Sequence, residues 1–585
     1  MKYEAFPKLP PAVLLLLTVF GSTLVFLSPP AFASIGCGAT ITSNTTLSQN
    51  IGPCSGNGLV IGANGISLDC AGYTIAGTST NAGSGIYLNG ITRASVDNCN
   101  VTAFRSGFYL IDSSHNSFTK NTANGNNRFG FYLVSSPHNA FNTNKADGNT
   151  YYGFYLYASP SNALTTNTAD SNGFYGFTLS SSSHNALTSN TASGNAHDGF
   201  ALGYSSHNTL GKNVAKDNLD FGFYLVSSTY NALTSNTADS DQVYGFYLYA
   251  SQNNVLEGNT AETNGYYGFT LYKSTYNALT SNSANSSSHN GFALGYSSYN
   301  TFSANTADNN DWFGFYLVSS PHNAFTTNKA DGNTYYGFYL VSSPSNALTT
   351  NTADSNGYYG FTLSSSSDNT LTTNAASTNV YGGIVLYGSS DRNTLTGNTA
   401  SGERDGFALY SASDDNKLSG NTASNNAHDG FIVRDSSDGN QLSGNTASGN
   451  GYFGFYLGSV SSNALTGNIA NVNNEYGFYL LGSSGNTLSG STADGNSQYG
   501  FALATSSNKN TLADNTANGN GNDGFSVVAS SSNSFTKNTA DHNSLFGYYD
   551  TTRGSGTSGT ANKYTGNVCA GIGVAGSDPS ALGAP

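Results

Sequence analysis

The sequence predicts an all-β protein, a single-stranded right-handed parallel β-helix (a solenoid) of about 20 coils of 23 to 24 residues. Three observations predict this fold. A glycine opens each repeat at a constant spacing, at Gly107, Gly130 and onward to Gly406, and then with one extra residue in some coils as far as Gly547. Each repeat contains short stretches of alternating apolar and polar residues, typical of strands with one buried face. No stretch of ten residues has the apolar spacing of an amphipathic helix.

Residues 1–33 are expected to form a secretory signal peptide. Two lysines precede an apolar run from Ala12 to Leu27, and the sequence AFA at 31–33 matches a small-x-small cleavage site. An uncleaved membrane anchor is the alternative, because the apolar run is close to the shortest length that spans a bilayer. With cleavage, no membrane span is expected. The segment therefore predicts a secreted protein, located outside the cell or at its surface.

Residues 34–106 are expected to form an N-terminal cap and the first irregular coils. Four of the five cysteines lie here, and in a secreted protein such clustering indicates disulfides that protect the exposed end of the solenoid. The first hypothesis pairs Cys37 with Cys54 and Cys70 with Cys99, one of the three pairings that four cysteines allow. Cys569 remains, either as a thiol or as one half of a disulfide between chains.

Residues 107–550 are expected to form the regular coils. Strands of neighbouring coils lie about 4.8 Å apart, so each residue should lie on its counterpart one coil later. Phenylalanines from Phe108 to Phe361 form one such column, which we place in the core. Two asparagine columns start at Asn116 and Asn121 and should form buried amide ladders, the second interrupted at Ser491. Residues 551–585 are expected to form a terminal coil and a flexible tail.

The repeat G-[FI]-x-L-x-x-S-S-x-x-N-x-L-x-x-N-x-A-x-x-N covers residues 58 to 550. It resembles the NosD-like right-handed parallel β-helix repeat, a branch of the pectin-lyase-like superfold. The resemblance implies the fold but no single activity, because that superfold includes lyases, hydrolases, epimerases, adhesins and binding modules.

The chain is acidic and has few charges. Without the two lysines and one glutamate of the signal segment, its 19 basic and 33 acidic side chains become 17 and 32, a net charge of −15. No basic stripe is present, so nucleic acid is not expected as a partner, and an acidic polysaccharide is disfavoured.

Tyrosines on the outward side of the first strand are the main candidate binding residues. They recur in blocks of four coils, which would place successive pairs of tyrosines about 19 Å apart along the axis. Exposed tyrosine rings suit a polysaccharide or cell-surface glycan, or a protein partner; alternatively, tyrosine is present because it favours strands. The candidates are Tyr132, Tyr155, Tyr157, Tyr224, Tyr247, Tyr249, Tyr316 and Tyr339.

A weaker set of candidates could carry catalysis. An acid precedes the opening glycine at Asp198, Asp405, Asp429 and Asp523, and among these only Asp405 and Asp429 belong to adjacent coils. Two carboxylates about 5 Å apart could protonate and attack a glycosidic bond, with Arg404 and His428 beside them. The alternative is that this position is simply exposed to solvent.

No cofactor or metal is expected. An aspartate column that includes Asp147 and Asp170 is interrupted at Ser193, Lys216 and Asn285, which disfavours a calcium array. Copper is disfavoured because Met1 is the only methionine and the histidines occur singly in turns.

These observations favour a non-catalytic secreted or cell-surface protein that binds glycan or another surface through its tyrosines. The first alternative is a polysaccharide lyase or glycoside hydrolase acting at Asp405 and Asp429. The second is a structural or adhesive filament protein.

Overall fold

The computed structural model describes residues 35–79, 83–569, 575–579 and 582. Contacts divide the chain into Met1–Ile35 and a second compact unit, Gly36–Pro585, which contains the repeats. The expected signal peptide, residues 1–33, lies outside the described residues.

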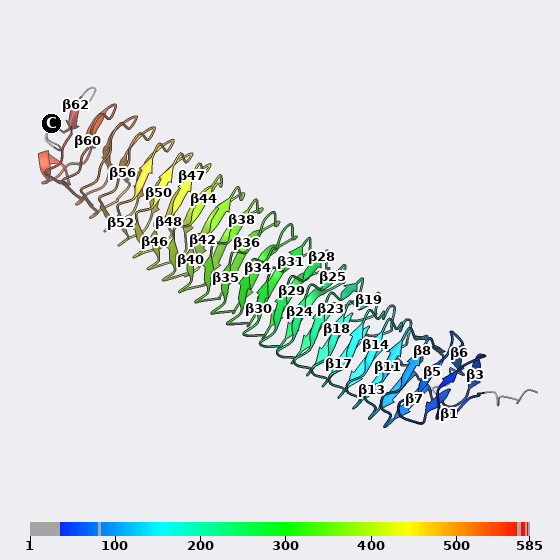
Figure 1. The fold of residues 1–585 in the computed structure, drawn as a ribbon. Helices are drawn as coiled ribbons and strands as arrows, with labels where there is room; N and C mark the ends of the chain where they lie inside the picture. The colour runs from blue at the N-terminus through cyan, green and yellow to red at the C-terminus, as the bar shows by residue number, and fades with distance from the viewer. Residues whose placement is uncertain (1–34, 80–82, 570–574, 580–581, 583–585) are drawn as a thin grey trace, which may run out of the picture. The chain divides into compact units, whose positions relative to one another are not determined.

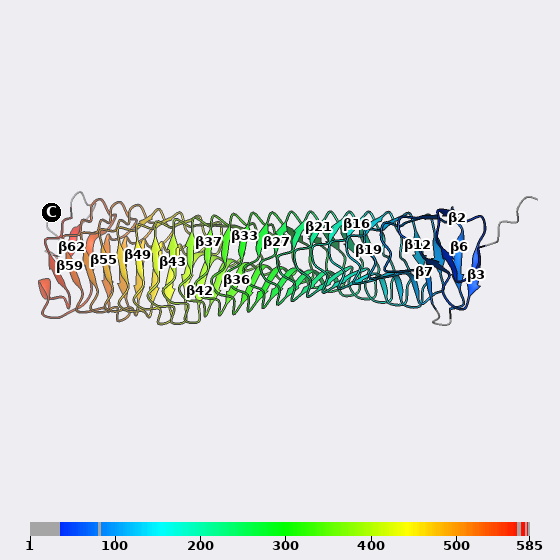
Figure 2. The same ribbon diagram turned by 60° about the horizontal axis from the view of Figure 1, so that its bottom comes forward.

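The second unit is a right-handed parallel β-helix, as predicted, with strands of successive coils stacked side by side (Figures 1 and 2). A regular coil has three strands, for example β23 (Phe221–Val226), β24 (Ala232–Thr234) and β25 (Thr237–Asp239). Each pairs in parallel with its counterpart one coil later, so that Phe223 lies opposite Phe246 and Tyr224 opposite Tyr247. Residues at the same position of successive coils therefore form continuous columns along the solenoid.

The first sheet carries the candidate sites and has 24 strands within the described ranges. Its strands are β1 (Ala39–Ile41), β4 (Leu59–Ile61), β7 (Ser84–Asn89), β10 (Ser106–Ile111), β13 (Phe129–Val134), β15 (Tyr152–Tyr157), β17 (Phe177–Ser180), β20 (Phe200–Gly203), β23, β26 (Tyr244–Tyr249), β29 (Tyr267–Tyr272), β32 (Asn290–Gly295), β34 (Phe313–Val318), β36 (Tyr336–Val341), β39 (Tyr359–Ser364), β42 (Gly382–Tyr387), β45 (Asp405–Leu409), β48 (Phe431–Arg434), β51 (Phe455–Gly458), β54 (Phe478–Leu481), β56 (Phe501–Ala504), β58 (Phe525–Val528), β60 (Phe546–Asp550) and β62 (Ala575–Asp578).

The other two faces of each coil are formed by strands of two to four residues. The second sheet runs from β2 (Thr45–Thr46) to β61 (Lys563–Thr565). The third face begins with β3 (Ile51–Cys54), and its last strand is β53 (Ile469–Asn471). In several coils a single bridge, such as Lys145 with Thr168, replaces the third strand. A regular coil thus has three strands, with the third reduced to one residue pair in places.

The phenylalanine column fills the core, as predicted. Phe131 and Phe154 stack with ring centroids 4.6 Å apart and planes 3° apart. All members from Phe108 to Phe361 are buried. Rings of the second sheet, such as Phe141, meet this column edge-on. In this column, each coil from Phe108 to Phe361 therefore buries one phenylalanine ring, which stacks on the ring of the next coil.

The asparagine ladders are also present. The side-chain oxygen of Asn139 accepts hydrogen bonds from the backbone amide (2.9 Å) and the side-chain amide (3.0 Å) of Asn116, and the pattern continues along the rod. The second ladder begins one coil earlier with a cysteine, since the Cys99 backbone amide donates to Asn121. A third buried ladder, which the sequence analysis did not single out, starts at Asn126 and Asn149.

Two carboxyl groups occupy positions in the third ladder. Asn218 donates to Oδ1 of Asp241 from its backbone and side chain, at 2.9 and 2.8 Å, and the side-chain amide of Asn379 donates to Glu403 at 3.2 Å. Within the part of the chain that the structure describes, the second carboxyl oxygen of each residue has no hydrogen-bond partner. Burial raises the pKa of Asp241 to about 7 and that of Glu403 to about 8.

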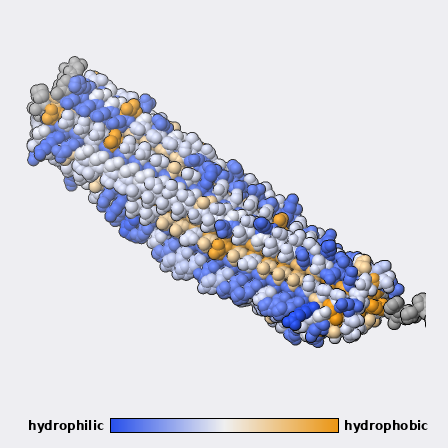
Figure 3. All heavy atoms as spheres, in the orientation of Figure 1, coloured by the Kyte–Doolittle hydropathy of each residue, from blue (hydrophilic) through white to orange (hydrophobic). Residues whose placement is uncertain are grey.

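The N-terminal end contains the disulfides Cys37–Cys54 and Cys70–Cys99, the pairing given by the first hypothesis. Cys569, at the other end, is buried. The face drawn in Figure 3 shows broad pale rows beside blue patches, with orange confined to a narrow stripe and isolated spots. This matches a chain in which only 9% of residues are charged.

The opening glycine is required because the core leaves no room for a side chain. A Cβ at Gly314 would lie 2.7 Å from the Gly337 carbonyl oxygen and 2.7 Å from the Ala330 Cβ. We expect Gly314→Ala to lower the free energy of unfolding by about 1 to 3 kcal/mol, because overpacking forces backbone shifts. Thermal unfolding checks this, with Gly203→Ala as the control, since its Cβ would meet only Val226 at 3.7 Å. An equal effect of both variants would contradict this explanation.

Candidate functional site

The outer face of the first sheet carries two parallel columns of aromatic rings, which we call the aromatic face. The leading column is formed by the residue directly before each opening glycine, and the outer column by the residue two positions after it. Leading residues include Phe129, Tyr152 and Tyr175, and outer residues include Tyr132 and Tyr155. Rings stack along each column and also across columns, as Tyr152 does with Tyr155 at 5.0 Å.

Most of the predicted tyrosines are half-buried, which corrects the expectation of exposed rings. Each ring covers its neighbour one coil away, so that Tyr132 and Tyr155 stack with centroids 5.4 Å apart. The Tyr224–Tyr247 and Tyr316–Tyr339 pairs repeat this arrangement at 5.4 and 5.6 Å. Tyr157 is exposed and Tyr249 is half-buried. Stacked rings present mainly their edges and hydroxyls to a ligand, and their faces become accessible only where a column is interrupted.

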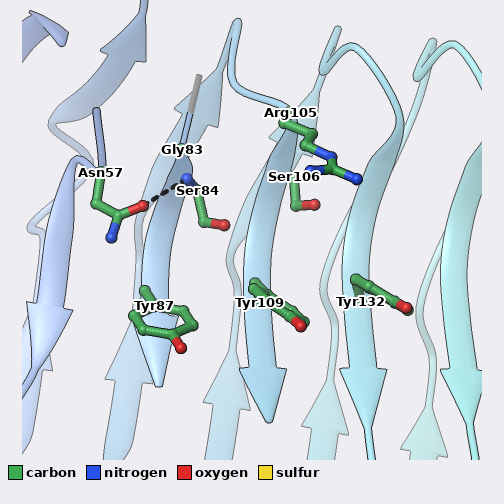
Figure 4. Close-up of a pocket in the computed structure, with 8 residues that line it drawn as sticks. All are labelled: Asn57, Gly83, Ser84, Tyr87, Arg105, Ser106, Tyr109 and Tyr132. Carbon is green, nitrogen blue, oxygen red and sulfur yellow. Dashed lines mark hydrogen bonds between the residues drawn. The ribbon is translucent and has the colours of Figure 1, made fainter. Parts of the chain in front are cut away.

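Hollows interrupt the aromatic face within the described residues, and we number three of them along the chain. The first, of about 480 Å³, forms where Ser84 and Ser106 stand in the leading column in place of rings. Figure 4 shows Tyr87, Tyr109 and Tyr132 in a row on β7, β10 and β13, with the Arg105 guanidinium beside them. The Asn57 side chain accepts a hydrogen bond from the Ser84 amide at 2.8 Å and holds this edge in place (Figure 4).

The second hollow, of about 370 Å³, interrupts the outer column between Tyr247 and Tyr316. Thr270 and Ala293 occupy the two positions between these tyrosines, and Gly295 widens the gap on the same strand as Ala293. The Thr270 hydroxyl is buried and has no hydrogen-bond partner among the described residues. The hollow therefore has aromatic walls, and the unpaired Thr270 hydroxyl is buried beneath its surface.

The corresponding gap one block later, at Thr362, is covered. The hydroxyls of Tyr339 and Tyr387 lie 2.9 Å apart and form a bridge across two coils. The third hollow, of about 150 Å³, opens further along the rod. It brings together all four weak catalytic candidates with aromatic and apolar neighbours, and its lining residues are Tyr359, Tyr381, Arg404, Asp405, Tyr410, His428, Asp429, Ile432, Arg434 and Tyr456.

The two aspartates of the third hollow are largely buried, so the alternative of a simply solvent-exposed position does not describe them. The Asp405 side chain is 13% exposed, and Asp429 as a whole residue is 9% exposed. Burial raises the pKa of Asp429 to about 7; the Phe453 amide opposes this shift, and the nearby carboxylates of Asp405 and Glu475 add to it. Burial also raises the pKa of Asp405, where the Asp429 amide, Arg404, His428 and Arg434 oppose the shift.

Sequence reasoning found the third hollow's acids but missed the first two hollows. The sequence does mark the hollows, because each begins where a small residue replaces a ring in the leading or outer column. These residues are Ser84 and Ser106 in the first hollow, Thr270 and Ala293 in the second, and Gly382 in the third. The sequence of the columns does not predict that Tyr339 and Tyr387 close the gap at Thr362.

Comparison with known proteins identifies relatives of the repeat. A family model described as periplasmic copper-binding protein (NosD) matches residues 69–237, 203–328 and 279–399, and a right-handed β-helix model matches 383–517. A comparison with curated sequences finds no significant match. Among the residues that the structure describes, no helix is long and apolar enough to cross a membrane.

Solved structures with similar folds include two alginate-modifying enzymes and a lyase. The periplasmic alginate epimerase AlgG is 14% identical, over 53% of this chain and 76% of its own, at a TM-score of 0.31. The A-module of Azotobacter vinelandii mannuronan C-5 epimerase AlgE6 is 14% identical over 62% and 90%, at 0.28. Pectate lyase Pel9A is 12% identical over 40% and 67%, at 0.26. These similarities concern the fold alone.

The copper of the NosD description does not fit the residues present. In the described ranges, no group of three or more His, Cys, Asp or Glu side chains could hold a metal ion. Histidines contact other aromatic rings, as His115 stacks on His138 at 4.9 Å and His197 on Phe174 at 4.9 Å. Copper therefore has no role in the function proposed below.

Proposed function

Because the chain belongs to the NosD family of right-handed β-helix proteins, whose fold presents one long sheet face, we propose that it binds polysaccharide along its aromatic face. Binding would take place outside the cytoplasm, at the cell surface or in the extracellular space. The two disulfides and the family's periplasmic description support a compartment outside the cytoplasm.

The second hollow is the observation that carries this proposal. Tyr247 and Tyr316 belong to one column and are three coils apart, about 14 Å. No ring lies between them in that column, because Thr270 and Ala293 occupy the two intervening positions. The aromatic walls offer stacking surfaces to a sugar ring. The hydroxyls of the tyrosines that line this hollow, such as Tyr272, can bond sugar hydroxyls.

The first hollow extends the same surface toward the N-terminal end. There, Arg105 and two serine hydroxyls supply hydrogen-bond donors beside three tyrosines. An extended polymer lying parallel to the rod axis would meet aromatic stacking surface and polar groups in alternation. This arrangement supports a linear polysaccharide over a compact protein partner, which remains the alternative from sequence.

We expect the double variant Tyr247→Ala/Tyr316→Ala to bind polysaccharide about tenfold or more weakly, because it removes both aromatic walls, each worth about 0.5 to 1.5 kcal/mol. Affinity gel electrophoresis against a panel of soluble neutral and uronate polysaccharides measures the loss. The control is Tyr276→Ala/Tyr299→Ala, an exposed stacked pair whose centroids are 5.1 Å apart and which lies outside the three hollows. Equal retention of both double variants would contradict the proposal.

A further inference from the structure

In the third hollow, both aromatic columns are interrupted over three successive coils. The leading column there reads Tyr359, Gly382, Asp405, Asp429 and Phe453. The outer column is replaced by Val385, Ala408 and Ile432, which form a buried apolar cluster between flanking tyrosines. The result is a hollow with an apolar floor and two carboxyl groups along one edge.

The two carboxyl groups are related by a translation of one coil. Oδ1 of Asp405 accepts the backbone amide of Asp429 at 3.4 Å, and Oδ1 of Asp429 accepts that of Phe453 at 3.0 Å. Because the same oxygen makes the same contact in successive coils, the two groups are parallel and about 4.8 Å apart. This is close to the carboxyl separation of about 5 to 5.5 Å in glycosidases that retain anomeric configuration.

Basic groups distinguish the two acids. Nε of Arg404 lies 3.9 Å from Oδ2 of Asp405 and donates a hydrogen bond to Nδ1 of His428 at 3.3 Å. The Arg434 guanidinium lies over the Tyr410 ring, 4.4 Å from its centroid. Arg404 and Arg434 both favour the charged form of Asp405. Arg404 also acts on Asp429, but Asp429 has the carboxylates of Asp405 and Glu475 nearby. Asp405 is thus the group that ionises first, and Asp429 the group that keeps its proton.

A structural role for an acid at this position explains only part of the arrangement. Asp198 and Asp523 occupy the leading column singly and accept the amide of the next coil in the same way, from Phe221 at 3.3 Å and Phe546 at 3.2 Å. One carboxyl therefore suffices to accept that amide. Two adjacent carboxyls add mutual repulsion, which a structural role does not require.

We propose that the third hollow is a glycoside-hydrolysing site, with Asp429 as the general acid and base and Asp405 as the nucleophile. The inference rests on the proposed binding of polysaccharide along the same face. A hollow of about 150 Å³ is smaller than a drug-sized site, so it would take a single ring while the rest of the polymer lies on the aromatic face.

The reaction balances with one water molecule. Asp429 donates its proton to the glycosidic oxygen as the Asp405 carboxylate attacks the anomeric carbon, which breaks the bond to the leaving sugar and forms a glycosyl ester. Asp429, now ionised, takes a proton from water, and the resulting hydroxide displaces Asp405 from the anomeric carbon. The products are two shorter chains, one with a new reducing end of retained configuration.

The test measures new reducing ends released from the panel of neutral and uronate polysaccharides, with the full chain. We expect release from a polymer that the protein also retains in the affinity gel, with a rate that falls as the pH rises through about 7, where Asp429 loses its proton. Asp405→Asn and Asp429→Asn should each reduce the rate by about 10²- to 10⁴-fold. The matched control Asp523→Asn, at the same position of another coil, should keep it.

Several outcomes would overturn the inference. A polymer that is retained but not cleaved would overturn hydrolysis and leave the binding proposal in place, whereas no retention and no cleavage would remove both. Full activity in either third-hollow variant, when thermal unfolding confirms that the variants are folded, would exclude these roles. Products that carry an unsaturated uronate would show elimination in place of hydrolysis.

Discussion

Replacing Asp241 with asparagine should stabilise the protein at alkaline pH and leave its stability at acid pH almost unchanged. Asp241 lies in a buried ladder whose corresponding positions one block away, Asn149 and Asn333, are asparagines. One of its oxygens accepts two hydrogen bonds from Asn218, and the other has no partner within the described structure. An amide restores the donor that the ladder provides elsewhere.

The sign follows from the pKa of this carboxyl. Its pKa is about 7 in the folded protein, against a value of 3.8 for an unburied aspartate. Between these two values the unfolded chain has released the proton and the folded chain has not, so stability decreases as the pH rises from about 4 to about 7. At 1.36 kcal/mol per pKa unit, the total loss is on the order of 4 kcal/mol, and Asp241→Asn removes it.

Urea unfolding midpoints of the wild type and Asp241→Asn, compared at about pH 4 and about pH 9, measure this effect. The reverse variant Asn333→Asp is the matched control, because it places a carboxyl at the same point of the next block. It should lose stability at about pH 9 by a similar amount. A stability difference between wild type and Asp241→Asn that does not depend on pH would show that this carboxyl is not the source.

Replacing Asn323 with leucine should cost about 3 to 6 kcal/mol of unfolding free energy, because several buried hydrogen bonds are lost together. The Asn323 oxygen accepts two hydrogen bonds from Asn300, and its amide donates to the carbonyls of Ser297 and Ser320, both at 2.9 Å. Leucine is similar in size but leaves these buried donors and acceptors unpaired, each at a cost of about 1 to 3 kcal/mol.

Chemical denaturation measures this loss, and Asn142→Leu serves as the control. Asn142 lies in β14 (Ala140–Asn142), where its side chain is exposed, so its replacement should change stability by less than about 0.5 kcal/mol. If Asn323→Leu were equally mild, the ladders would contribute little to the stability of the rod.

The family resemblance and the local pattern predicted most of the fold. A repeat of fixed length forces residues of equal position into contact, so the Phe131 column and the Asn139 ladder could be predicted without coordinates. The cysteine pairing was also correct. The third ladder is equally visible in the sequence as the last asparagine of the repeat, although Asp241, Ser287 and Glu403 interrupt it.

The solvent exposure of the outward side chains was not predictable from their positions alone. Alternation along the strand predicts that outward tyrosines are exposed, yet stacking at the coil spacing leaves each ring only partly exposed, as Tyr132 and Tyr155 show. The same stacking makes small residues important, because a missing ring opens a hollow where no neighbouring ring covers the gap, as at Thr270 and Ala293.

The sequence by itself determined the coil, the core columns and which residue types occupy each outward column, because a repeat of constant length fixes which residues touch. Only the tertiary structure decided where the outward columns open into hollows and how deeply Asp405 and Asp429 are buried. The reason is physical: burial and pKa depend on side chains from several coils at once, such as Tyr359, Tyr410 and Tyr456 around the third hollow.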